Sequence, residues 1–203
     1  MKEWKGNKDA VRSRLGINKQ HTTKDWETDD FYATDPVALE KLIQAAPHIF
    51  AGNKVVWECA CGNGNLAQVL GSYGFPIFAS DLKNRGYGFS NTDFLEQINF
   101  IDADVILTNP PYVLATEFAV HALEILPPGG VYVALMNLSY LAGQKRYAQL
   151  YSTGQLREVY VFSKRVECWR NNDREQHGGK LMADYAWYVF QKGYTGQPTL
   201  YWL

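Results

Sequence analysis

Residues 58–67 mark the point where an apolar run gives way to a helical pattern, and they read Glu58-Cys59-Ala60-Cys61-Gly62-Asn63-Gly64-Asn65-Leu66-Ala67. Gly62 and Gly64 permit a tight strand-to-helix turn whose backbone can approach a ligand closely. Ala67 completes a GxGxxA spacing that dinucleotide-binding folds also use. Glu58 falls near the end of an otherwise apolar run, where a buried carboxylate needs a partner such as a cationic ligand. The stretch therefore predicts a strand, a turn suited to ligand binding and a helix in succession.

Apolar runs bounded by turn residues alternate with helical stretches on both sides of this turn. The expected strands cover residues 54–61, 76–80, 105–108, 131–137, 158–162 and 185–191. The expected helices cover residues 36–47, 65–72, 115–126 and 144–151. This alternation predicts an α/β fold with a mostly parallel sheet and helices on both faces. A polar segment without a helical pattern joins the last two runs, so we expect those two strands to pair antiparallel.

Length and composition favour one domain, because 203 residues with 46% hydrophobic content can bury one sizeable core. The net charge of -1 provides no global basic field. The first 24 residues nevertheless hold seven Lys or Arg against two Asp or Glu. We therefore expect a basic arm at residues 1–28, either a disordered tail or a segment that contacts phosphate, followed by a domain at residues 29–203.

Three cysteines are present, and the spacing of Cys59 and Cys61 matches neither a redox CxxC pair nor a zinc knuckle. We expect both to be reduced thiols in the core, and we expect no metal site. No signal-peptide pattern and no run of transmembrane length occurs, so a soluble, cytoplasmic protein with no membrane partner is expected.

Acidic residues follow two of the expected strands, where an open parallel sheet binds its ligands. Asp81 comes 19 residues after Gly62 and could accept hydrogen bonds from both hydroxyls of a ribose. Asp93 could accept from an adenine amine while Phe94 meets the base. Helix caps or turn residues are the simpler interpretation of both aspartates.

The segment Asn109-Pro110-Pro111-Tyr112 follows the apolar run at residues 105–108. Its two prolines remove backbone donors and hold the chain extended, which leaves the carbonyls of Asn109 and Pro110 free to accept. An acceptor side chain, an acceptor carbonyl and an aromatic ring form a receptor for a planar NH2 group. A polar turn that merely ends a strand is the alternative.

An exocyclic amine on an aromatic base is a poor nucleophile, because its lone pair is delocalised into the ring. Acceptors from Asn109 and Pro110 would raise the electron density on that nitrogen. Binding a methyl donor in line makes the transfer effectively unimolecular. A sulfonium donor leaves as a neutral thioether, so no strong general base is required.

These motifs resemble the adenine-N6 DNA methyltransferases with a Rossmann-like fold, in particular small enzymes of phage and prophage type. The resemblance covers roughly residues 29–203 and rests on Asp30–Pro36, Trp57–Gly64, Asp81 with Arg85–Gly88, Asp93-Phe94, Asn109–Tyr112 and Tyr185–Phe190. It implies S-adenosyl-L-methionine as the cofactor. The implied cofactor-binding residues are Tyr32, Thr34, Pro36, Glu58, Ala60, Gly62, Gly64, Asp81, Asp93, Phe94 and Asn109. Tyr32, Thr34 and Pro36 would lie near the methionine carboxylate, and the implied catalytic residues are Asn109, Pro110 and Tyr112.

The resemblance also implies a nucleic-acid partner, DNA in the first place, with Tyr112 on the target base. Because 13 residues follow Phe190, we expect no separate recognition domain. The polar loop at residues 165–181 is the best candidate for substrate contacts, through Arg165 and Trp169, and a mobile connector is the alternative. The oligomeric state is left open.

Other functions use parts of the same pattern. Asn-Pro-Pro-Tyr also suits enzymes that methylate RNA adenine or the amide of protein glutamine, since each substrate presents a planar NH2. A nucleotide-cofactor oxidoreductase would use the glycine turn and Asp81 but not Asn109–Tyr112. A binding module that has lost catalysis would keep the fold, yet the complete set of strand-end motifs argues against it.

Overall fold

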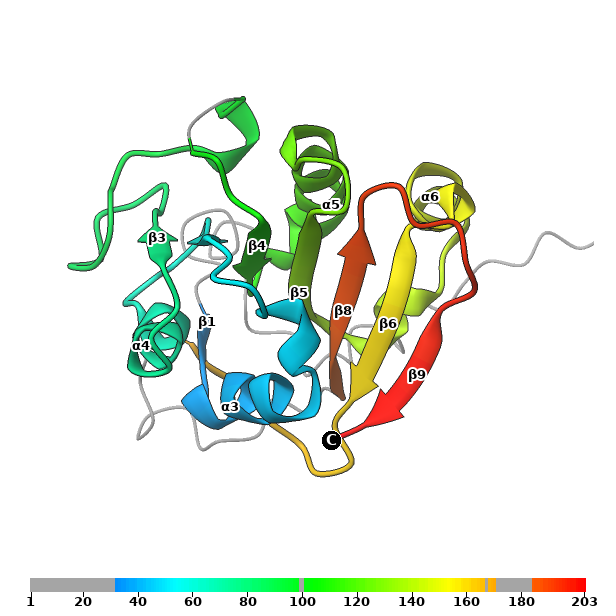
Figure 1. Cartoon of the computed structure of the whole chain (residues 1–203), viewed down its shortest axis with the longest axis horizontal. Helices are drawn as coiled ribbons and strands as arrows, with labels where there is room; N and C mark the ends of the chain where they lie inside the picture. Colours follow the sequence, from blue (N-terminus) through cyan, green and yellow to red (C-terminus); the bar gives the residue numbers. More distant parts are fainter. Residues whose placement is uncertain (1–31, 99–100, 167, 171–183) are drawn as a thin grey trace, which may run out of the picture.

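The computed structural model describes residues 32–98, 101–166, 168–170 and 184–203. These residues form a seven-stranded sheet and a separate two-stranded one, β1-β7. Helices cover both faces of the large sheet (Figure 1). The α/β class with a mostly parallel sheet is confirmed.

The strands are β1 (Tyr32–Thr34), β2 (Val56–Glu58), β3 (Ile77–Ala79), β4 (Val105–Thr108), β5 (Val131–Asn137), β6 (Leu156–Val161), β7 (Cys168–Arg170), β8 (Tyr185–Gln191) and β9 (Thr199–Trp202). The α-helices are α3 (Pro36–Ala45), α4 (Asn65–Ser72), α5 (Ala115–Ile125) and α6 (Gln144–Gln149). Short 3-10 helices are η1 (Pro47–Ile49), η2 (Phe94–Glu96), η3 (Tyr112–Leu114), η4 (Leu138–Leu141) and η5 (Tyr151–Thr153).

The large sheet has the strand order β3-β2-β4-β5-β8-β6-β9. The first four strands are parallel, and β8 runs antiparallel to both of its neighbours, β5 and β6. The expected antiparallel pairing of residues 158–162 with residues 185–191 is therefore confirmed. Beyond β6 the edge strand β9 pairs in parallel, a strand that the sequence pattern did not predict.

Alternate residues of the inner strands point to opposite faces, because successive side chains of a strand do so. In β5, Val131, Val133 and Leu135 join the core that α3 and α4 cover. Tyr132 and Ala134 join the core that α5 covers. Burial on both faces explains why the strand sequences are continuously apolar.

Strand β2 spans only Val56–Glu58 and is therefore shorter than the strand that the apolar run at residues 54–61 predicted. Its pairing with β3 ends at Glu58, after which the chain turns toward Gly62. Cys59 and Cys61 therefore follow the strand instead of lying on it. Both are buried free thiols, as expected.

Three helices end a little earlier than the sequence pattern predicted, at Ala45, Ile125 and Gln149, while α4 has its predicted bounds. Helix α3 begins at Pro36, and the side chain of Asp35 caps it by accepting from the Val37 N–H at 3.1 Å.

Strands β1 and β7 pair antiparallel, with Thr34 opposite Cys168 and Tyr32 opposite Arg170. The segment expected to be a polar loop thus contains a short strand that lies beside β1. Residues 171–181 of that loop and the basic arm at residues 1–28 lie outside the described residues.

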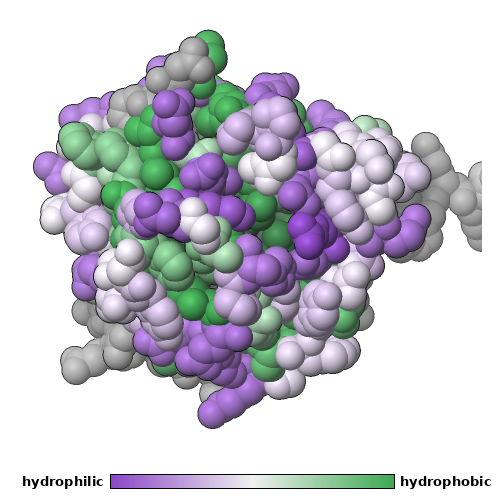
Figure 2. All heavy atoms as spheres, viewed as in Figure 1, coloured by the Kyte–Doolittle hydropathy of each residue, from purple (hydrophilic) through white to green (hydrophobic). Residues whose placement is uncertain are grey.

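The face of the molecule in Figure 2 shows hydrophilic and hydrophobic residues interspersed, and no hydrophobic patch spans its width. Among the residues that the structure describes, no helix is long and apolar enough to cross a membrane.

Candidate active site

A cavity of about 320 Å³ opens beyond the carboxyl ends of β2, β3 and β4, with β1 along one side. Its walls come from the segments after those strands and from η2 and η3. Most of the predicted site residues line it: Tyr32, Thr34, Glu58, Ala60, Asp81, Asp93, Phe94, Asn109, Pro110 and Tyr112. Residues from five segments of the chain therefore meet in one place.

The glycine turn has the backbone shape that its residues permit. Gly62 and Gly64 have φ values of 57° and 85°, in the left-handed region that glycine enters without strain. A Cβ on Gly64 would collide with the ring of Tyr87. Neither glycine is among the residues that line the cavity. They shape the turn that carries Cys61 and Asn63 to the cavity wall.

The two carboxylate oxygens of Asp81 hold the glycine turn and the loop that follows β3. Oδ2 accepts from the Gly62 N–H and Oδ1 from the Lys83 N–H, each at 2.8 Å. A carboxylate has about four acceptor positions, so each oxygen can still accept one more hydrogen bond. The turn role and the ribose role, which the sequence posed as alternatives, are thus compatible in one side chain.

Glu58 is buried at the end of β2, and its Oε2 has no hydrogen-bond partner among the described residues. Burial raises the pKa of Glu58 well above its ordinary value, and repulsion from Asp81 adds to the rise, while a hydrogen bond from the Ala67 backbone opposes it. A cation in the cavity would stabilise the ionised carboxylate.

Asp93 and Phe94 form another wall of the cavity. The Asp93 side chain caps η2 by accepting from the Leu95 N–H at 3.0 Å. Phe94 is buried and packs edge-on against Trp57, with ring centroids 5.2 Å apart. The turn role expected as the simpler interpretation of Asp93 is present, and the residue also faces the cavity.

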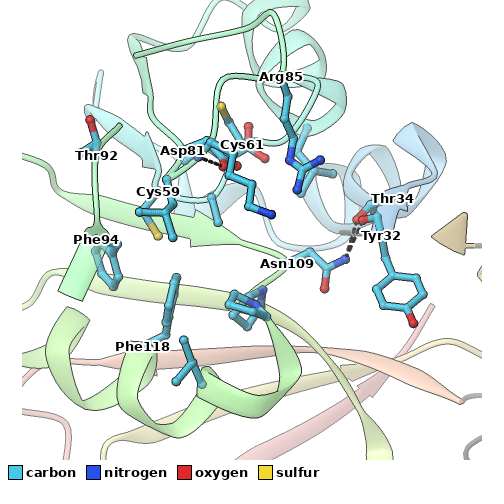
Figure 3. A pocket seen from close by; sticks show the side chains of 18 of the residues that line it. Tyr32, Thr34, Cys59, Cys61, Asp81, Arg85, Thr92, Phe94, Asn109 and Phe118 are labelled. Carbon is cyan, nitrogen blue, oxygen red and sulfur yellow. Dashed lines mark hydrogen bonds between the residues drawn. The ribbon is translucent and has the colours of Figure 1, made fainter. Parts of the chain in front are cut away.

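Asn109 follows β4, and its amide nitrogen is held by β1. Nδ2 donates to the Thr34 Oγ1 at 3.0 Å and to the Tyr32 carbonyl at 3.3 Å (Figure 3). Because a carbonyl only accepts, the nitrogen side of the amide must face Tyr32. Oδ1 is buried without a hydrogen-bond partner among the described residues. Two residues that line the cavity, Asn109 and Glu58, thus each carry a buried oxygen without a hydrogen-bond partner among the described residues.

Tyr112 begins η3 and lies between two other tyrosines. Its hydroxyl donates to the Tyr185 hydroxyl at 3.0 Å, and the two rings are stacked with centroids 6.3 Å apart. The ring of Tyr32 is tilted against it at 5.8 Å. The ring of Tyr112 is therefore held in place at the cavity wall.

The structure does not place three further predicted contacts at the cavity. Pro36 begins α3 and does not line the cavity. Arg165 is exposed, pairs with Asp184 at 3.1 Å and does not line the cavity. Trp169 belongs to β7, opposite Ala33, and its side chain lies outside what the structure describes.

Sequence reasoning assigned no role at the site to several cavity residues. Lys83 and Arg85 line the cavity on the loop after Asp81, and Figure 3 shows Arg85 reaching down toward it. Their position shortly after an acidic strand end was the available signal. Val113 and Leu114, which follow Tyr112, are also exposed at the cavity. Nothing in their apolar character distinguishes them from core residues.

No protein-family model matches the chain, and no curated protein matches it in sequence. Solved structures do match in fold. A class I S-adenosylmethionine-dependent methyltransferase described as putative, from Listeria monocytogenes, aligns with a TM-score of 0.62 at 13% identity, over 96% of this chain and 71% of that one. The chain has the methyltransferase fold. Its Rossmann-like sheet, which the family resemblance implied, is confirmed.

Two further solved structures that align with this chain are larger than it. The type IIG restriction endonuclease BpuSI aligns with a TM-score of 0.61 at 15% identity, over 93% of this chain and 28% of that one. The methyltransferase subunit of a type I restriction-modification system from Streptococcus thermophilus gives 0.58 at 16% identity, over 82% of this chain and 45% of that one. The chain thus spans less than half the length of either.

Proposed function

We propose that this protein is an S-adenosylmethionine-dependent methyltransferase that acts on the N6 amine of adenine in DNA. The observation that carries the proposal is the Asn109 amide, whose nitrogen is engaged by β1 and whose buried oxygen is left as an acceptor at the cavity. An unpaired buried acceptor is costly, so a donor from a ligand would stabilise it. A planar NH2 group is such a donor.

The cavity fits the cofactor by the same reasoning. Glu58 is a buried carboxylate with an unpaired oxygen, and a positively charged ligand would satisfy it. Asp81 would accept from the ribose hydroxyls, and Asp93 with Phe94 would hold the adenine ring. Thr34 and Tyr32, with Ala60, would lie along the methionine part. When bound, the cofactor supplies an activated methyl group on sulfur.

The chain's own residues prepare the amine. Asn109 Oδ1 and the Pro110 carbonyl would each accept one of its hydrogens, which raises the electron density on the nitrogen. Tyr112 would stack on the base, because its ring is already fixed between Tyr32 and Tyr185. Preorganised groups of this kind do not have to reorient during the reaction.

DNA is proposed as the substrate on two grounds. The relatives include a restriction endonuclease and a subunit of a restriction-modification system, whose names refer to enzymes of DNA. A base within a duplex must leave the helix to reach such a cavity, and an aromatic platform offsets part of the unpairing energy. Arg165 and Trp169, on the segment that contains β7, remain proposed contacts to the nucleic acid.

Mass spectrometry of nucleosides tests the proposal directly. DNA of mixed sequence is incubated with the protein and methyl-labelled cofactor, with RNA and a glutamine-containing protein in parallel. We expect labelled N6-methyladenine from DNA alone, and no label with Asn109→Ala although the cofactor still binds. Label in cytosine, RNA or protein would keep the amine chemistry and reject the proposed substrate.

A further inference from the structure

Thr34 accepts hydrogen bonds from two asparagines on different segments around the cavity. Its carbonyl accepts from the Asn65 Nδ2 at 3.1 Å, at the start of α4 and beside the glycine turn. Its hydroxyl accepts from the Asn109 Nδ2 at 3.0 Å, beyond β4. Thr34 is also only 3% exposed, so water has little access to replace either hydrogen bond. A single buried residue therefore joins the first residue of α4 to the amide beyond β4.

The two partners of the Asn109 nitrogen act differently. The Tyr32 carbonyl can only accept and so decides which side of the amide faces β1. The Thr34 hydroxyl makes the shorter bond and, because threonine has few side-chain rotamers, fixes where the nitrogen sits. With the nitrogen held at two points, the position of Oδ1 at the cavity is determined as well.

We infer that Thr34 is a positioning residue that holds the Asn109 amide with its oxygen toward the amine to be methylated. The consequence for catalysis rests on the proposed function, whereas the orientation of the amide does not. A bond to the cofactor's methionine carboxylate, which the family resemblance implies for Thr34, would use the hydroxyl proton and leaves the acceptor role intact. Loss of the positioning role should lower kcat, whereas loss of the contact to the methionine carboxylate should weaken cofactor binding.

Three variants separate these roles. Thr34→Val keeps the shape of the side chain but cannot accept, Thr34→Ser keeps the hydroxyl, and Thr108→Val removes a buried hydroxyl one residue before Asn109. Thr108 does not line the cavity, and its hydroxyl is not among the described partners of the Asn109 amide. We expect Thr34→Val to lower kcat roughly tenfold, the effect of one lost hydrogen bond on the transition state. Thr34→Ser should restore most of kcat, and Thr108→Val should match the wild type.

The affinity for cofactor gives the decisive comparison. If Thr34 acts through Asn109, Thr34→Val lowers kcat while the Kd for S-adenosylhomocysteine, measured by calorimetry, changes less than about twofold. A loss of cofactor affinity with an unchanged kcat at saturating cofactor overturns the inference and leaves the carboxylate role.

An NMR measurement on the protein labelled with 15N-asparagine tests the geometry without any turnover. Two hydrogen bonds should give the Asn109 side-chain amide slow hydrogen exchange, with Asn109→Ala identifying the signal. We expect the signal to shift and its exchange to accelerate in Thr34→Val but not in Thr34→Ser or Thr108→Val. An unchanged signal in Thr34→Val overturns the inference. If the signal moves but the wild type methylates no adenine, the proposed function fails while the positioning role stands.

Discussion

Asp81 serves the structure of the apo protein before it meets any ligand. Its two oxygens hold the backbone of the glycine turn and of the next loop through Gly62 and Lys83. Removal of the carboxylate therefore takes away two backbone acceptors together with the proposed ribose contact. A loss of binding in Asp81→Ala has to be separated from a loss of stability.

The comparison with Asp104→Ala makes that separation. Asp104 also accepts from a backbone N–H, that of Val55 at 2.9 Å, but does not line the cavity. We expect both variants to lower the free energy of unfolding by about 1–3 kcal/mol, and only Asp81→Ala to weaken cofactor binding by about 1–3 kcal/mol. Denaturant titration and calorimetry measure the two effects. Equal cofactor affinity in the two variants would remove Asp81 from the site.

Tyr112 should act through its ring. Base stacking is worth about 1–3 kcal/mol, so Tyr112→Ala should lower kcat/KM on DNA by a factor of roughly five to 150. Tyr112→Phe keeps the ring, loses the hydroxyl that donates to Tyr185 and should retain most of the activity. Tyr73→Ala, at an exposed tyrosine that does not line the cavity, serves as the control. Full activity in Tyr112→Ala would contradict the stacking role.

At the scale of elements, the glycine turn provides a test with an internal control. Gly64 and Gly74 stand on either side of α4 with φ values of 85° and 79°. Alanine at either position should lower the free energy of unfolding by about 1–2 kcal/mol, because its Cβ strains a left-handed backbone. Only at Gly64 would the new Cβ also meet a side chain, the ring of Tyr87. The two alanine variants therefore differ in whether the new Cβ meets the Tyr87 ring.

We expect Gly64→Ala to cost about 1–3 kcal/mol more than Gly74→Ala, because overpacking adds to the backbone strain. The turn should also shift, so Gly64→Ala should weaken cofactor binding while Gly74→Ala should not. Thermal denaturation and cofactor titration of both variants measure this. Equal stability of the two would mean that Tyr87 moves aside at little cost.

The sequence predicted the long, periodic elements well and missed three short strands. Continuous apolar runs such as Val131–Asn137 are recognisable because both faces are buried. Strand β1 has three residues, too few for a period, and its partner β7 lies more than 130 residues later. All four residues of β9 are exposed, so no alternation marks it.

The lining of the cavity was predictable where a chemical motif ended a strand, as at Asp81 and Asn109. It was not predictable where two distant segments decide a side chain's orientation. The hold of Thr34 and Tyr32 on the Asn109 amide depends on the placement of β1, which local sequence does not determine.

For the whole molecule, Glu58 should set a pH dependence of stability. Its pKa in the folded protein is raised above the ordinary value of 4.5, so the folded state retains a proton that the unfolded state loses. The stabilisation is complete below that value and is lost as the pH rises through the folded-state pKa. The free energy of unfolding of the apo protein should therefore fall with rising pH across this window.

Glu58→Gln should flatten this slope and make the apo protein more stable at neutral pH, because the amide cannot ionise. Glu117→Gln, at an exposed position on α5, should leave the slope unchanged. Urea titrations at several pH values above 4.5 measure the slope. A wild-type slope in Glu58→Gln would show that another group is responsible.

The position of β8 in the sheet has a consequence for the order in which the chain can fold during synthesis. β8 is made after β5 and β6 but lies between them. Until Tyr185–Gln191 has left the ribosome, β6 cannot join the sheet and β5 presents an unpaired, apolar edge. Such pairing between distant segments is slow, and exposed edges are prone to aggregation. A nascent chain that stalls before Tyr185 should therefore be a substrate for chaperones, although the motif-bearing strands β2 and β4 are already complete.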